Sequence, residues 1–173
     1  MHIVMGVGTY WRYLVAWGRR RGAYLALACS VLLGGTFGQA AMLKMPLEYL
    51  ASTADTVVLG TVTRQVSAWD SQHTAIHTDV TVQVEQAMLG SAGAEVTFRI
   101  AGGIVGGMGM RTSNDARFQD GERVIVFLNT RTTPGSLVGL EQGKLLVQDN
   151  MVTFDGEPKR LDEMIAAIRT AVR

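Results

Sequence analysis

The chain has 173 residues and a formal net charge of +1, from sixteen lysines and arginines against fifteen acids, and 47% of its residues are hydrophobic. This length fits one domain, or one domain with a processed segment. The composition excludes a disordered polar tail, a collagen-like repeat and a multi-pass membrane protein. Because Cys29 is the only cysteine, a disulfide-stabilised scaffold is excluded as well.

The charge is divided unevenly along the chain. Residues 1–40 carry four arginines and no acid, which leaves twelve basic groups against fifteen acids, a net charge of −3, for residues 41–173. Proteins that bind nucleic acids concentrate lysine and arginine to displace phosphate counterions, and residues 41–173 do not. We therefore expect no nucleic-acid partner.

Residues 1–40 have the pattern of an export signal. Three arginines at positions 19–21 precede an uncharged stretch rich in Ala and Leu, residues 22–37, and small residues follow up to Ala40. This pattern predicts a hydrophobic leader helix that a signal peptidase removes after Ala40 or Ala41. The rest of the chain would then work in the periplasm or outside the cell.

Two alternatives for the leader remain open. Residues 22–43 contain no charge and are long enough to cross a bilayer, so they could anchor an uncleaved chain in the membrane. Cys29 follows a sequence that loosely resembles a lipidation motif, so it could instead become a lipidated first residue. Only an uncleaved or lipidated leader would give this protein a contact with a membrane.

Residues 41–173 are predicted to form a single domain that starts with a short helix and continues mainly in strands. Residues 46–51 predict a helical turn that begins at a proline, and residues 55–67, rich in Val and Thr, predict the first strand. Gly60 within that strand indicates a bulge or a close backbone crossing. Residues 76–85 alternate strictly between apolar and polar side chains, which is typical of a strand with one buried face.

Further strands are predicted over residues 95–100, 122–129, 136–140, 144–148 and 151–154. Residues 122–129 form a continuous apolar run, which indicates a central strand that is covered on both faces. After Pro158, apolar residues recur at helical spacing and predict an amphipathic helix that ends the chain. Strands and helices do not alternate, so we do not expect a parallel doubly wound sheet. A small antiparallel barrel of five to seven strands fits best, with a β-sandwich as the alternative.

The most conspicuous candidate for a binding surface is a glycine-rich segment. We expect it to be a long loop that either fills space around the barrel or contacts a partner with its apolar side chains, because no helix follows it to complete a phosphate-binding loop. The candidate residues are Gly102, Gly103, Ile104, Val105, Gly106, Gly107, Met108, Gly109, Met110 and Arg111.

Three other side chains are weaker candidates. Trp69 could be an exposed aromatic in the loop after the first strand, or could pack over the mouth of the barrel. His77 and Asp79 share the polar face of the second strand, where solvent exposure alone explains them. His73 and His77 are too far apart along an extended strand to hold one metal ion, so we predict no metal and no cofactor.

Several segments taken together resemble a known kind of domain. The sequence of residues 47–63, the run from Phe118 to Leu128 and the sequence of residues 139–144 are similar to an uncharacterised bacterial exported domain. Their layout also resembles the netrin-like domain of the tissue inhibitors of metalloproteinases, which is an OB-fold barrel. The resemblance covers residues 46–148 and implies an OB-like barrel with an extracytoplasmic, non-catalytic role.

One departure limits that resemblance. The inhibitors reach a catalytic zinc through an N-terminal cysteine, and residues 41–173 contain no cysteine. Their inhibitory mechanism therefore does not transfer, and we expect a binding domain for a protein or peptide, not an enzyme. An inhibitor or accessory factor of an exported protease, and a small hydrolase that uses carboxylates such as Asp115, Asp120, Glu122 and Glu141, are the alternatives; the ligand and the oligomeric state stay open.

Overall fold

A computed structural model describes residues 43–172 of the chain. The predicted signal peptide, the alternative membrane anchor and Cys29 lie outside the described residues, apart from Leu43 at the end of the anchor segment. The elements in chain order are α2 (Leu47–Thr53), β1 (Thr56–Trp69), β2 (Ile76–Leu89), β3 (Glu95–Ala101), β4 (Gly103–Val105), β5 (Met108–Met110), β6 (Arg123–Asn129), β7 (Gly135–Leu137), the 3-10 helix η1 (Leu140–Gly143), β8 (Lys144–Gln148), β9 (Met151–Phe154), β10 (Glu157–Arg160) and α3 (Leu161–Ala171).

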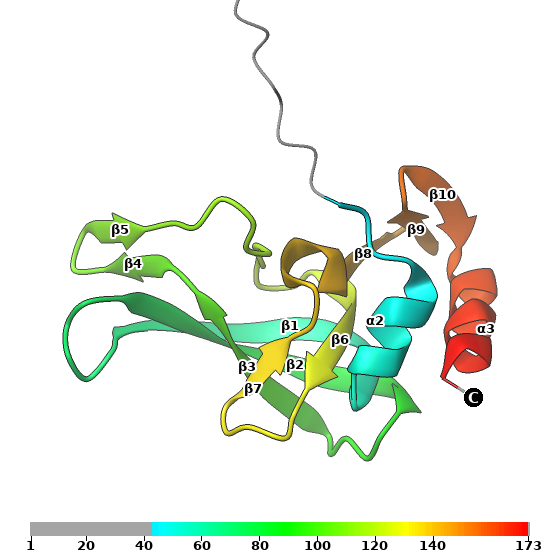
Figure 1. The fold of residues 1–173 in the computed structure, drawn as a ribbon, viewed down its shortest axis with the longest axis horizontal. Coiled ribbons are helices and arrows are strands. Elements are labelled where there is room, and N and C mark those ends of the chain that lie inside the picture. Colours follow the sequence, from blue (N-terminus) through cyan, green and yellow to red (C-terminus); the bar gives the residue numbers. More distant parts are fainter. Residues whose placement is uncertain (1–42, 173) are drawn as a thin grey trace, which may run out of the picture. The chain divides into compact units, whose positions relative to one another are not determined.

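Five strands close into a small barrel, as the sequence predicted. They follow the order β1-β2-β3-β7-β6, and β6 pairs again with β1 to complete the ring. All neighbours are antiparallel except β3 and β7, which run parallel through two residue pairs. The strands β8, β9 and β10 extend the sheet beyond β6, and α2 and α3 lie on their side of the barrel (Figure 1).

The hydrophobic core has two parts that meet at β6. Val124, Val126 and Leu128 point into the barrel, while Ile125 and Phe127 point towards the two helices, and all five are fully buried. The prediction of a strand covered on both faces is therefore confirmed, because the barrel covers one face of β6 and the helices cover the other.

The alternating valines of β2 are buried on one face of the strand, as predicted. Val80 and Val82 are fully buried inside the barrel, next to Phe98 of β3. Gly60 lies where the register between β1 and β2 shifts, and a Cβ atom there would come within 2.7 Å of Cγ1 of Val82. The predicted close crossing of two strands is thus present at Gly60.

Three details of the predicted elements were wrong. The strand expected at 136–140 ends at Leu137, because the chain turns into η1, where the amide of Glu141 donates to the carbonyl of Asn114 (3.1 Å). Strand β10 was not predicted, and Pro158 lies inside it; an edge strand tolerates proline because its outer side needs no donor. Trp69 ends β1 and does not lie in the following loop.

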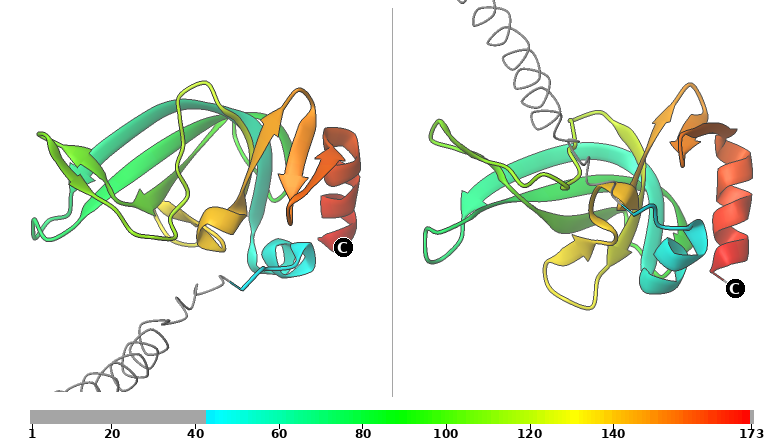
Figure 2. Two further views of the ribbon diagram at one scale, coloured as in Figure 1. Left: turned by 90° about the horizontal axis from the view of Figure 1, so that it is seen from above. Right: turned by 45° about the horizontal axis from the view of Figure 1, so that its top comes forward.

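The hairpin of β1 and β2 is longer than the barrel needs. Each strand has fourteen residues, and their far ends project past the ring together with the β4–β5 hairpin, as the two views of Figure 2 show. This end of the domain lies opposite α2 and α3 (Figure 1). It carries the glycine-rich segment that the sequence singled out.

Candidate functional site

The glycine-rich segment is a β-hairpin and not the long loop that we expected. Strands β4 and β5 pair in register from Gly103 opposite Met110 to Val105 opposite Met108. The two residues between them, Gly106 and Gly107, have φ angles of +60° and +83°. A two-residue turn with both φ angles positive matches the twist of paired strands, and glycine adopts it without steric cost.

The hairpin is attached to the β1–β2 ribbon through Gly102, the residue just before β4. The amide of Gly102 donates to the carbonyl of Ile76 (2.8 Å), and the Thr78 hydroxyl donates to the carbonyl of Gly102 (2.7 Å) in a buried position. The hydroxyl groups of Thr78 and Ser67 are themselves 2.8 Å apart. These contacts fix the direction in which the hairpin leaves the barrel.

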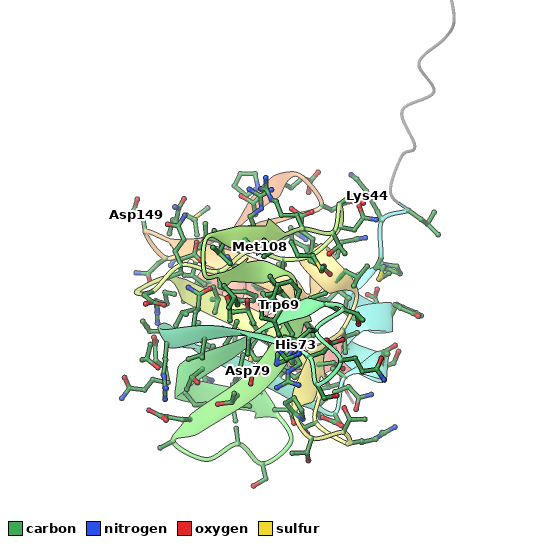
Figure 3. All side chains as sticks on the ribbon, turned by 90° about the vertical axis from the view of Figure 1, so that its left-hand side faces the viewer. Lys44, Trp69, His73, Asp79, Met108 and Asp149 are labelled. Atoms are coloured by element: carbon green, nitrogen blue, oxygen red, sulfur yellow. The ribbon has the colours of Figure 1, made fainter. Side chains whose placement is uncertain are left out.

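The hairpin exposes two large apolar side chains. Ile104 is 71% exposed and Met108 is 61% exposed, and no residue from Ala101 to Met110 is charged. In Figure 3 Met108 and Trp69 lie at the projecting end of the domain, on two different hairpins. Trp69 is half-buried, and its ring stacks on His73 of the adjoining turn, with the ring centres 6.2 Å apart.

A pocket of about 420 Å³ lies beside the hairpin. Ile100, Ala101 and the hairpin form one part of its wall, and the segment that follows β5 forms the other. The residues that line it are Thr78, Ile100, Ala101, Gly102, Gly103, Ile104, Gly109, Met110, Arg111, Thr112, Asp115, Ala116 and Arg117. The wall is mainly apolar, and its charged groups are Arg111, Asp115 and Arg117.

Asp115 is the unusual group in this wall. Its Oδ2 atom is buried and has no hydrogen-bond partner among the described residues. Burial raises the pKa of Asp115 above its ordinary value, because a desolvated carboxylate is less stable than the neutral acid. A partly desolvated acid that has no hydrogen-bond donor and lies at a pocket wall is a candidate for contact with a ligand.

The two candidates on β2 have a structural explanation. The guanidinium of Arg99 on β3 donates two hydrogen bonds to Asp79, of 2.6 Å and 2.8 Å. These bonds hold the pKa of Asp79 below its usual value of 3.8. His77 is half-buried two residue pairs further along the same two strands, opposite Ala101. Within residues 43–172, no group of three or more His, Cys, Asp or Glu side chains is placed to hold a metal ion.

The structure does not gather the four candidate carboxylates into one site. Glu122 forms an ion pair with Lys144 (2.5 Å), and Asp120 accepts a hydrogen bond from the side-chain amide of Gln65 (3.0 Å). Asp115 and Glu141 line a second pocket, of about 410 Å³. Asp115 is therefore the one candidate carboxylate that borders both pockets.

Sequence reasoning missed the hairpin although a signal was present. A Gly-Gly pair between short apolar runs is a standard indicator of a two-residue hairpin turn, and Ile104-Val105 and Met108 flank this one. The role of Arg117 and Asp115 in a pocket wall had no local signal, because it depends on where the segment after β5 packs.

Comparison with known proteins adds no identification. No protein-family model matches the chain, and no curated protein matches it either. In the part of the chain that the structure covers, no helix has both the length and the apolar character needed to cross a bilayer.

Proposed function

We propose that this chain is an exported, non-catalytic domain that binds a protein or peptide through the β4–β5 hairpin. One observation carries the proposal: a short, uncharged hairpin projects from the barrel and exposes both Ile104 and Met108. Single exposed apolar residues are common on protein surfaces, but two on one projecting hairpin beside a largely apolar pocket form the kind of surface that partners cover.

The energetics favour such a contact. Covering a side chain of this size contributes about 1.5–3 kcal/mol, so the two together could supply a large part of the affinity for a peptide. The hydrogen bonds of Gly102 to β2 already hold the hairpin in place. Binding would therefore cost little conformational entropy at the hairpin.

The backbone of β5 offers a second means of recognition. Within the described residues, β5 pairs only with β4, so its other side presents backbone groups to an incoming strand. An extended peptide can add to such an edge, with main-chain hydrogen bonds for affinity and side-chain contacts for specificity. We expect the partner to bind in this extended form.

We further propose that the barrel is of the OB type and is related to netrin-like domains. The strand order β1-β2-β3-β7-β6 with closure to β1 supports this, since OB-fold barrels consist of five strands in a Greek-key arrangement. A role as inhibitor or accessory factor of an exported protease agrees with a peptide-binding hairpin and stays a prediction. The hydrolase alternative also stays a prediction.

Export is proposed from the leader sequence alone. Alkaline phosphatase fused after residue 173 is active only outside the cytoplasm, so the fusion should be active with residues 1–40 present and inactive without them. Mass spectrometry of the recovered chain then distinguishes cleavage after Ala40 or Ala41 from retention of the leader. Activity of the fusion that lacks residues 1–40 would contradict the proposal.

The binding proposal is tested with a library of displayed peptides. The full chain is used for selection, and selected peptides are then measured against the variants Ile104→Ser and Met108→Ser. We expect each variant to weaken binding at least about tenfold, which corresponds to the loss of one buried apolar side chain. The control is Leu140→Ser, because Leu140 is 48% exposed but belongs to η1, outside the hairpin.

Two results would contradict the proposal. One is a failure to select any peptide above the background of the empty support. The other is an equal loss of binding in Leu140→Ser and in the two hairpin variants, because that would place the contact elsewhere or show a general effect of surface polarity.

A further inference from the structure

The pocket beside the β4–β5 hairpin combines three features that one ligand group could satisfy together. Its wall is mainly apolar, two arginines without carboxylate partners border it, and so does the carboxylate of Asp115, which accepts no hydrogen bond within residues 43–172. We propose that this pocket binds the C-terminal residue of a peptide. Its carboxylate would contact Arg111 and Arg117, its backbone N–H would donate to Asp115, and its apolar side chain would occupy the pocket.

The two arginines are free to bind an anion. Neither Arg111 nor Arg117 forms an ion pair or a side-chain hydrogen bond within residues 43–172, and both are exposed. Four other arginines of the domain do have a carboxylate within 4 Å, namely Arg99, Arg123, Arg131 and Arg160. Arginine presents a planar array of donors that matches a carboxylate, so a pair of unengaged guanidinium groups at a pocket favours a carboxylate ligand.

Asp115 favours a ligand that also carries a hydrogen-bond donor. Its Oδ2 atom is buried without a partner, although Arg111 and Arg117 border the same pocket. Only Oδ2 is buried in this way, so Oδ1 is the oxygen that a ligand can reach, and no described residue donates a hydrogen bond to it. A ligand that brings an N–H to the pocket would supply that donor.

The rest of the wall suits a small apolar group with a backbone attached. Ile100, Ile104 and Met110 contribute apolar side chains, while Gly102 and Gly109 contribute none, which allows the main chain of a ligand to come close. The volume of about 420 Å³ has room for one apolar residue with its terminal carboxylate.

Other ligand classes satisfy only part of this arrangement. A lysine or arginine side chain would satisfy Asp115 but would face the positive charges of Arg111 and Arg117. A simple anion would satisfy the arginines and leave Asp115 without a donor. The terminal residue of a peptide carries a carboxylate and an N–H on the same Cα atom, so it satisfies both. This inference rests on the proposed function, whose partner it specifies.

The test compares two forms of one small probe. N-acetyl-Ala-Ala-Leu with a free carboxylate, and the same peptide with a C-terminal amide, are titrated to about 10 mM into the 15N-labelled chain, purified from cells that express its full length, with NMR detection. We expect the free carboxylate to bind at least about tenfold more tightly, because only this form accepts charge-assisted hydrogen bonds from the two arginines. The shifted amide signals should come from the hairpin and from residues 111–117.

Variants separate the roles of the three charged groups. Arg111→Gln and Arg117→Gln should each reduce the preference for the carboxylate form several-fold and leave the amide form unaffected. Asp115→Ala should weaken both forms alike, because both peptides carry the N–H. The matched control is Arg169→Gln, since Arg169 is exposed on α3 and has no ion pair within residues 43–172. This variant should bind both forms of the peptide as the wild type does. The NMR spectrum of each variant reports whether it has folded.

Several results would overturn the inference. They are binding of the amide form as tight as that of the acid, absence of binding by both forms, and an effect of Arg169→Gln equal to that of Arg111→Gln. Octanoate serves as a carboxylate without an N–H, and octanoate binding as tight as that of the peptide would also overturn it. If the displayed peptides still bind through Ile104 and Met108 without any need for a free C-terminus, this inference fails while the proposed function stands.

Discussion

Replacement of Gly103 by alanine tests whether the hairpin is held to the barrel in the way described. Gly103 has a φ angle of +142°, and a Cβ atom there would overlap the hydroxyl of Thr78 and lie 2.5 Å from the hydroxyl oxygen of Ser67. The two hydroxyls could rotate away only by giving up their hydrogen bonds to each other and to Gly102, and the Cβ atom of Ser67, 2.9 Å away, moves only with its strand. The variant should therefore loosen the hairpin from its support.

The size of the effect follows from two contributions. A residue other than glycine in this backbone region costs about 1–3 kcal/mol, and overpacking of the site adds about 1–3 kcal/mol. The hairpin could avoid the overlap by lifting away from β2, but it would then lose the buried hydrogen bond from Thr78 to Gly102. By either route we expect Gly103→Ala to reduce the free energy of unfolding, or that of local opening, by about 3 kcal/mol.

The matched control is Gly107→Ala. Gly107 also has a positive φ angle, +83°, but a Cβ atom there would meet nothing within 4 Å. Only the backbone cost remains, about 1 kcal/mol. Urea unfolding followed by circular dichroism gives the global stability, and hydrogen exchange of the amide of Gly102 gives the local one. Equal effects of the two variants in both measurements would refute the packing described for Gly103.

Three further predictions concern the barrel and its ion pairs. Phe98→Ala should reduce the free energy of unfolding by about 3–5 kcal/mol in urea titrations, because Phe98 is fully buried in the barrel. Lys144→Met should cost about 2 kcal/mol in the same assay, because it leaves the mostly buried Glu122 without its cation, and a wild-type stability would count against this role. Asp79→Asn should flatten the loss of stability on acidification. The two bonds from Arg99 lower the pKa of folded Asp79 below 3.8, so its stabilisation is present above that pH and is lost as the pH falls through the folded value. Urea midpoints measured between about pH 6 and pH 2 should show it, and identical acid profiles for variant and wild type would contradict it.

Much of the barrel could be predicted because burial is recorded locally in the sequence. The alternation of apolar and polar residues from Ile76 to Val84 predicted β2, a strand with one buried face. The apolar run that ends at Asn129 predicted β6, a strand with two buried faces. The closure of the ring depends on two residue pairs between β3 and β7, and nothing near Phe98 or Gly135 in the sequence identifies them as neighbours.

The candidate site was only partly predictable for a related reason. The glycine-rich segment stood out by composition, so the sequence identified it as a candidate binding surface. Its glycines suggested a loop, because a glycine that forms a turn and a glycine that allows close packing cannot be told apart in a sequence. Gly106 and Gly107 form a turn, whereas Gly103 allows close packing on Ser67. The pocket has no local signature at all, since residues 111–117 reach it only through the packing of the domain.

Photo-crosslinking tests directly whether the hairpin is the surface that a partner covers. The photoreactive residue p-benzoylphenylalanine is introduced at Met108 of the full chain in living cells, and at Leu140 as a control of similar exposure. We predict a light-dependent adduct of discrete mass from position 108 that disappears when Ile104 is also changed to Ser, and no such adduct from position 140. No adduct from position 108, or the same adduct from both positions, would show that the hairpin is not the partner-binding surface.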